Sequence, residues 1–105
     1  MTVVKVAPGV CQFETRIVSE ADDAFNVTLE ISSDCANVRR LADQLKQVSA
    51  LSELRLPMPE TAVYQAAAAC KLHVACPVPS AILKAIEVAT GMALPADVHM
   101  TICAE

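Results

Sequence analysis

The stretch that organises the chain is residues 73–91, HVACPVPSAILKAIEVATG, whose second half has the pattern of a helix. Pro79 suits a first helical turn, because its missing N–H would have no partner there. Gly91 suits the left-handed residue that ends a helix, and Pro95 follows soon after. Apolar residues recur at helical spacing between them: Ile82, Leu83, Ala85, Ile86 and Ala89.

Cys76 comes just before the first turn of this predicted helix. The free N–H groups and the dipole of a helix N-terminus favour negative charge, so we expect the pKa of this thiol to be lowered. A cysteine in this place can be a metal ligand, a redox thiol or a packed side chain.

Two alternating segments predict an antiparallel hairpin over residues 11–31. The first runs from Cys11 to Ser19, and the second starts at Phe25, after an acidic turn at residues 20–23. Pairing Val18 with residue 24 would place Cys11 opposite Ile31. Cys11 and Cys35 would then lie at the same end of the hairpin.

The other segments complete an α+β pattern of one domain, residues 1–105. A short β-prone run covers residues 3–6. A helix capped by Asp34 or Asn37 should follow the hairpin, and a second should start at residue 60 or 61 and run to Cys70. The alternation around Val98, Met100 and Ile102 predicts a last strand. We therefore expect a small antiparallel sheet, formed by the 11–31 hairpin plus the C-terminal strand, with two or three helices on one face.

Composition limits the classes of partner. Of the 105 residues 54% are hydrophobic, the net charge is −4, and no basic cluster exceeds Arg39-Arg40. Nucleic acid is therefore not an expected partner. No run is long and apolar enough to span a bilayer, and the first five residues lack signal-peptide features, so we expect a cytoplasmic protein. The surplus of apolar residues would also suit a homodimer interface.

In the cytoplasm the five cysteines would be free thiols or metal ligands. Packing is the simplest role for Cys70 and Cys103. Cys11, Cys35 and Cys76 instead stand at the edges of predicted elements, two of them at helix starts, and are candidate ligands for zinc or an iron–sulfur cluster. Cys70 or His73 could supply a fourth ligand. There is no Cys-x-x-Cys pair and no glycine-rich phosphate loop.

Three motifs carry a resemblance: SDCANVRRLA at residues 33–42, ACPVPSAILKAIE at residues 75–87, and LPADV at residues 94–98. Together with the PGVCQF segment at residues 8–13 they resemble an uncharacterised family of short proteins from anaerobic bacteria and archaea. The resemblance implies a single α+β domain and singles out Cys11, Cys35 and Cys76, without implying a reaction.

A second likeness is to the TSCPD domain, a cysteine-bearing module associated with metal binding and attached to some ribonucleotide reductases. Cys35 with Asn37, and Cys76-Pro77, stand at its cysteine positions. The glycines usual around its first cysteine are absent here, and Val78 stands where an acid is usual.

Three functions follow as hypotheses. The first is a metal- or cluster-binding protein that uses these thiolates. The second is a thiol-redox or sulfur-handling protein, with Cys76 as nucleophile and Cys35 as resolving thiol. The third is an assembly module whose cysteines only pack. The sequence does not decide whether the protein is an enzyme.

Overall fold

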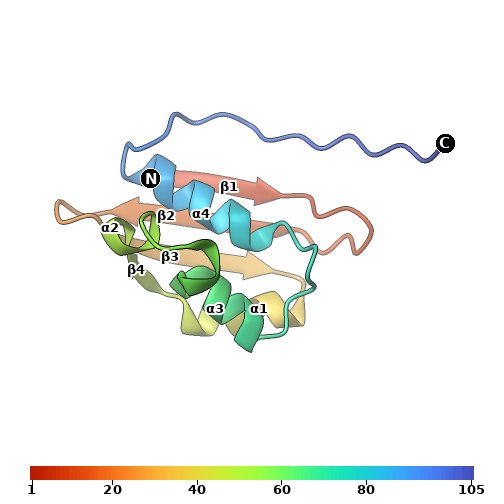
Figure 1. The fold of residues 1–105 in the computed structure, drawn as a ribbon, viewed down its shortest axis with the longest axis horizontal. Helices are drawn as coiled ribbons and strands as arrows, with labels where there is room; N and C mark the ends of the chain where they lie inside the picture. Colours follow the sequence, from red (N-terminus) through yellow and green to blue (C-terminus); the bar gives the residue numbers. More distant parts are fainter.

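The alternating segments form a four-stranded antiparallel sheet, with strand order β1-β2-β3-β4, in the computed structural model of residues 1–105 (Figure 1). The strands are β1 (Thr2–Val6), β2 (Thr15–Ala21), β3 (Asn26–Ser33) and β4 (Gln47–Ser49). Thr15, Ile17 and Ser19 of β2 are buried and alternate with exposed or half-buried residues, as expected for a sheet with one covered face. The expected α+β class is confirmed.

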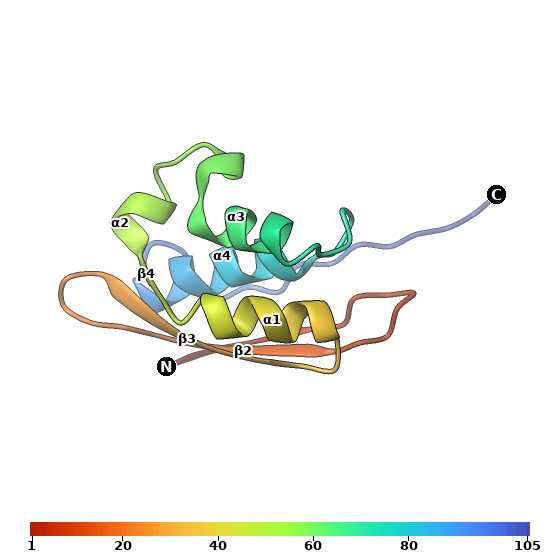
Figure 2. The same cartoon turned by 90° about the horizontal axis from the view of Figure 1, so that it is seen from below.

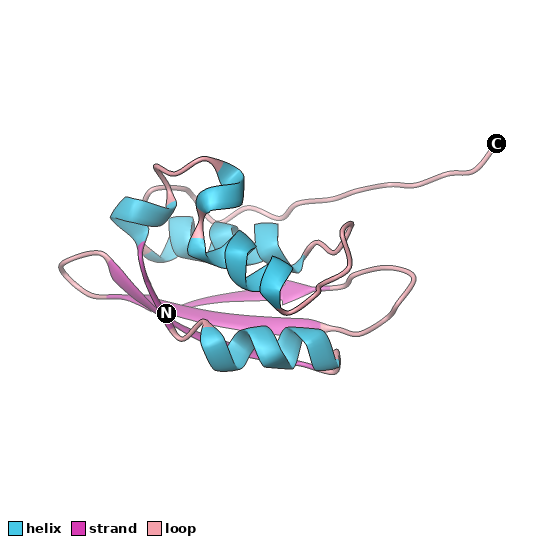
Figure 3. Ribbon diagram, turned by 60° about the horizontal axis from the view of Figure 1, so that its bottom comes forward, coloured by secondary structure: helices cyan, strands magenta, loops and turns pink.

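Four α-helices and one 3₁₀ turn follow or separate the strands. They are α1 (Ala36–Gln44), α2 (Ala50–Glu53), the 3₁₀ turn η1 (Met58–Glu60), α3 (Ala62–Ala69) and α4 (Val78–Ala89). Figures 2 and 3 show these helices on one face of the sheet. Helix α1 packs on β3, and α4 packs on β1 and β2. None of the helices has the length and apolar character needed to cross a membrane.

The core lies between the helices and the covered face of the sheet. Its largest fully buried side chains include Ile17 of β2, Leu41 of α1 and Ile82 and Ile86 of α4. Ser19 is also fully buried, and its hydroxyl donates a hydrogen bond of 2.9 Å to the carbonyl oxygen of Ala85. This bond satisfies the buried hydroxyl and joins α4 to β2.

A buried carboxylate holds the start of α3. Glu53, the last residue of α2, accepts hydrogen bonds from the backbone N–H groups of Ala62 (2.7 Å) and Val63 (3.2 Å). The hydroxyl of Thr61 accepts another from the N–H of Tyr64, as a helix cap does. The expected helix start at residue 60 or 61 is thus confirmed, and so is the end of α4 at Gly91, whose φ is +75°.

The hairpin register differs from the predicted one. Strand β2 begins at Thr15 and continues to Ala21, which pairs with Val27, and Ile17 rather than Cys11 lies opposite Ile31. The cause of the different register is the turn between β2 and β3. The Asp22 carboxylate accepts hydrogen bonds from the N–H groups of Ala24 and Asn26, and this moves the turn toward the C-terminus. The predicted strand start at Cys11 is therefore wrong, and Cys11 lies in the loop before β2.

The predicted C-terminal strand is also absent. Residues 92–105 form no strand, and residues 94–105 make no backbone hydrogen bond within the chain. The sheet is completed instead by β1 and β4 on either side of the β2–β3 hairpin. The predicted caps of α1 differ as well: Cys35 is the N-cap residue, without a side-chain capping bond.

Truncation of Ile17 should test the covered face of the sheet. Ile17→Ala should lower the free energy of unfolding by about 3 kcal/mol, because it leaves a cavity among fully buried side chains. Urea unfolding measures this value. Val18→Ala, on the opposite face of the same strand, is the control and should cost less than about 1 kcal/mol. Equal losses for the two variants would contradict this assignment of faces.

Candidate thiol site

Three cysteines lie at one end of the sheet. Cys11 is in the loop of residues 7–14 between β1 and β2, Cys35 is the residue before α1, and Cys76 lies two residues before α4. The sheet register explains the first two positions, because Thr15 pairs with both Val6 and Ser33. The loop after β1 and the start of α1 therefore share an end. Figure 1 shows the start of α4 at the same end.

Hydrogen bonds fix the backbone around Cys35. The Thr15 hydroxyl donates to the Ser33 hydroxyl (2.8 Å), which in turn donates to the carbonyl oxygen of Glu14 (3.3 Å). The N–H of Cys35 donates to the same Ser33 oxygen (3.1 Å), and the N–H of Asp34 to the Glu14 carbonyl (3.4 Å). The Ser33 side chain thus links the start of β2 to the start of α1.

A second set of bonds ties α1 to the segment that carries Cys76. The Asn37 side-chain amide donates to the carbonyl oxygen of Lys71 (3.2 Å), just after α3. Lys71 has a φ of +57°, a left-handed conformation that turns the chain away from α3. Within this segment, the N–H of Cys76 donates to the carbonyl oxygen of His73 (2.9 Å). Asn37, expected as a helix cap, instead joins two of the cysteine-bearing segments.

Two of the thiols act electrostatically on the third, Cys76. Partial burial raises the pKa of the Cys76 thiol above its ordinary value, and the nearby Cys35 and Cys11 thiolates raise it further. The backbone N–H of Val78, at the start of α4, acts in the opposite direction and lowers this pKa. The predicted lowering of the Cys76 pKa is therefore wrong, because loss of hydration and like charge outweigh the helix N-terminus.

The thiols differ in access to solvent. Cys35 and Cys76 are half-buried and pack against the core, whereas Cys11 is exposed. Its loop contains two residues with positive φ, Gly9 (+92°) and Gln12 (+61°), and a hydrogen bond from the Gln12 N–H to the Gly9 carbonyl. Two thiols thus have fixed surroundings, and the third stands on a surface loop.

The other sequence-predicted residues lie in different surroundings. Cys70 ends α3 inside the core and is only 3% exposed, so the packing role expected for it is confirmed. His73 is exposed on the segment between α3 and α4. Cys103 is exposed on the C-terminal tail, so its expected packing is wrong. All five cysteines are free, and no group of three or more His, Cys, Asp or Glu side chains is arranged to hold a metal ion.

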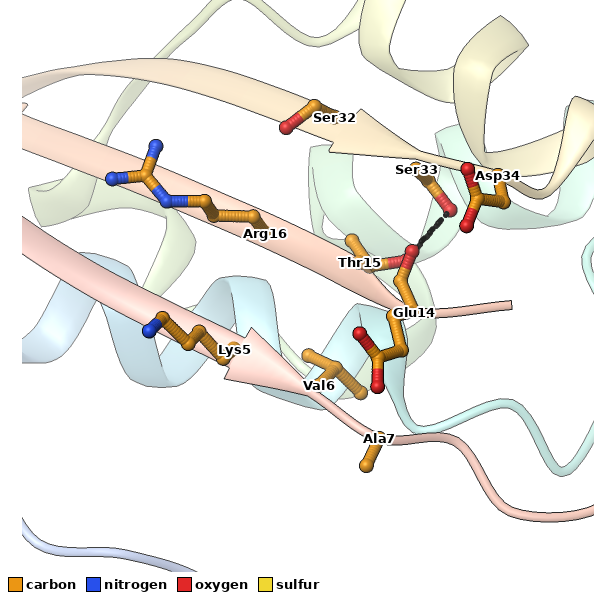
Figure 4. Close-up of a pocket in the computed structure, with 9 residues that line it drawn as sticks. All are labelled: Lys5, Val6, Ala7, Glu14, Thr15, Arg16, Ser32, Ser33 and Asp34. Atoms are coloured by element: carbon orange, nitrogen blue, oxygen red, sulfur yellow. Dashed lines mark hydrogen bonds between the residues drawn. The ribbon is translucent and has the colours of Figure 1, made fainter. Parts of the chain in front are cut away.

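An open groove of about 590 Å³ lies at the same end of the sheet (Figure 4). It is lined by Lys5, Val6, Ala7, Glu14, Thr15, Arg16, Ser32, Ser33 and Asp34. Lys5, Arg16 and Ser32 form one cross-strand row. Sequence patterning missed this groove, because cross-strand neighbours become visible only once the register is known. The groove has two cationic and two acidic side chains, so its charge favours neither an anionic nor a cationic ligand.

Removal of Cys35 should change the titration of Cys76. In Cys35→Ser the neighbouring thiolate is gone, so the pKa of Cys76 should move down toward its ordinary value. The rate of Cys76 alkylation against pH, followed by peptide mass spectrometry of metal-free protein, measures this shift. Cys103→Ser is the control and should leave the profile unchanged, because Cys103 does not contribute to this pKa. An unchanged profile in Cys35→Ser would contradict the electrostatic contact.

Comparison with known proteins gives one match. The model of a family of unknown function (DUF6951) matches residues 2–102, nearly the whole chain. No curated protein matches the chain, and neither does any solved structure.

Proposed function

The chain belongs to this family of unknown function, and from its geometry we propose that it binds zinc or an iron–sulfur cluster through the thiolates of Cys11, Cys35 and Cys76. The observation that carries the proposal is the meeting of three elements at one end of the sheet. These cysteines are separated by 23 and 40 intervening residues, yet they lie on the loop after β1 and at the starts of α1 and α4.

The surroundings of these thiols suit a thiophilic cation. Thiolate is the ligand form of cysteine, and three thiolates close together repel one another in the absence of a cation. Burial is the largest cause of the raised pKa of Cys76, and repulsion from Cys35 and Cys11 adds to it. A bound cation would remove this repulsion between thiolates, and the N–H of Val78 would continue to favour the thiolate form of Cys76. In this proposal the half-buried Cys35 and Cys76 form the fixed part of the site.

The exposed loop would complete the site. Since the thiols do not form a ready-made metal group, binding requires Cys11 to move toward the other two. Its loop has no regular secondary structure, so this movement breaks no sheet or helix. Of the two predicted fourth ligands, His73 is better placed, because it is exposed and hydrogen-bonded through its carbonyl to Cys76. Cys70 would have to leave the core.

The redox hypothesis is less well supported. A nucleophilic thiol in disulfide exchange needs a sizeable thiolate fraction near neutral pH, which a lowered pKa provides. The pKa of Cys76 is raised instead. The assembly hypothesis requires the cysteines only to pack, which Cys70 does and the exposed Cys11 does not.

Anaerobic titration with Co²⁺ tests the proposal, since Co²⁺ occupies zinc sites and its thiolate complexes absorb strongly. The wild-type protein should develop thiolate-to-cobalt absorption, and Cys76→Ser should bind at least about 10-fold more weakly. Reconstitution with iron and sulfide is a second arm, read by visible absorption.

The matched control is Cys103→Ser, which removes an exposed cysteine on the C-terminal tail. It should bind Co²⁺ as the wild type does. Absence of metal-dependent absorption in both arms of the wild-type experiment would overturn the proposal, and so would equal binding by Cys76→Ser and the wild type. Either result would leave the assembly hypothesis as the better account.

A further inference from the structure

Nearly all side chains of the C-terminal tail, residues 92–105, are exposed. After α4 the tail turns back, runs along the β1 side of the molecule and then extends past the end of the sheet (Figures 1 and 3). Four of its large apolar side chains are between 66% and 90% exposed: Leu94, Val98, Met100 and Ile102. Since residues 94–105 make no backbone hydrogen bond within the chain, their N–H and C=O groups are free to pair elsewhere.

The composition of the tail is that of a strand rather than of a disordered segment. Val98, Met100 and Ile102 alternate with His99 and Thr101, which places the apolar residues on one face of an extended chain. Disordered segments are instead poor in apolar residues and rich in charge. The family match extends to residue 102, so the tail as far as Ile102 belongs to the sequence that defines the family.

The sheet offers one long open edge. Strand β1 (Thr2–Val6) is at the end of the strand order and pairs only with β2. At the opposite edge, β4 has three residues and is continued directly by α2. Open edges are usually protected by charges, proline or bulges, whereas β1 carries Lys5 as its one charged side chain and no proline.

The charges of the tail and of this edge are complementary. The tail contains two acidic residues, Asp97 and Glu105, and no lysine or arginine. The edge strand contributes one basic side chain, Lys5. Five residues of β1 also match the five-residue alternating segment 98–102 in length. Main-chain pairing gives such contacts affinity, and alternate side chains give them specificity.

We infer that residues 98–102 of one copy add as a strand to the free β1 edge of a second copy, so that two chains exchange tails in a symmetric dimer. A second copy fits better than another partner, because the same chain carries both the donor segment and the acceptor edge. Two-fold symmetry then buries both tails at once. The exchange also explains why the tail's apolar face has no cover within one chain.

Sedimentation equilibrium of the full chain tests this inference together with amide hydrogen exchange. The wild type should sediment at twice its chain mass, with residues 98–102 and 2–6 protected from exchange. Met100→Asp should raise the dimer dissociation constant at least about 100-fold, because the change affects both exchanged tails. Thr101→Asp adds the same charge on the other face and is the matched control, with a smaller effect.

The test separates the alternatives. A wild-type chain that stays monomeric at all concentrations overturns the inference, as does a monomer whose tail is nevertheless protected, since that tail would be pairing within its own chain. A dimer equally stable in Met100→Asp and Thr101→Asp would also overturn it. Neither substitution touches the core, so thermal unfolding of the monomeric variant should show an intact fold. The result is independent of metal binding.

Discussion

The cross-strand row of Val6, Thr15 and Ser33 is the constraint on which the candidate site depends. Because Thr15 pairs with both neighbours, β1 ends and α1 begins at one end of the sheet. A hydrogen bond between the Thr15 and Ser33 hydroxyls stabilises this row on the covered side. The same Ser33 oxygen accepts a hydrogen bond from the N–H of Cys35. The register of the strands thereby fixes the position of Cys35. A shift of this row would move the Cys11 loop away from the start of α1 and so remove the basis of the candidate site.

The third thiol reaches this end by a different route. Helix α4 packs on β1 and β2, where the bond from Ser19 to the Ala85 carbonyl holds it. The start of α4 therefore lies over the same end of the sheet, and the Asn37 amide ties the preceding segment to α1. The electrostatic effect of Cys35 and Cys11 on the pKa of Cys76 is the chemical result of these packing contacts. The site thus depends on the sheet and the helix layer together.

Local patterns in the sequence predicted the class of fold and most element types. The stripe from Ile82 to Ala89, the stop at Gly91 and the burial of Ile17 all follow from periodicity and turn chemistry. The hairpin register was out of reach, because it depends on how the Asp22 carboxylate organises the turn. The role of Glu53 was also hidden, since its partners on α3 lie nine and ten residues away and meet it only after the 3₁₀ turn is formed.

The candidate cysteines were predicted as a group, and their segments meet at one end of the sheet although the pairing used in that prediction was wrong; the three side chains do not form a ready-made metal group. The pKa of Cys76 could not be predicted from the helix start alone, because burial and neighbouring thiols are properties of the folded chain. The C-terminal alternation of residues 98–102 is a real strand pattern, but a pattern does not tell which sheet the strand joins. In both cases the sequence does not show which distant residues become neighbours in the fold.

Cross-linking with a short bifunctional thiol reagent tests the central claim most directly, at a pH above the ordinary thiol pKa and with peptide mapping of the monomeric product. Bridges are expected among Cys11, Cys35 and Cys76, while Cys103 should be modified singly. Products in which Cys35 and Cys76 carry only single modifications, with no bridge from either to another of the three, would contradict the claim.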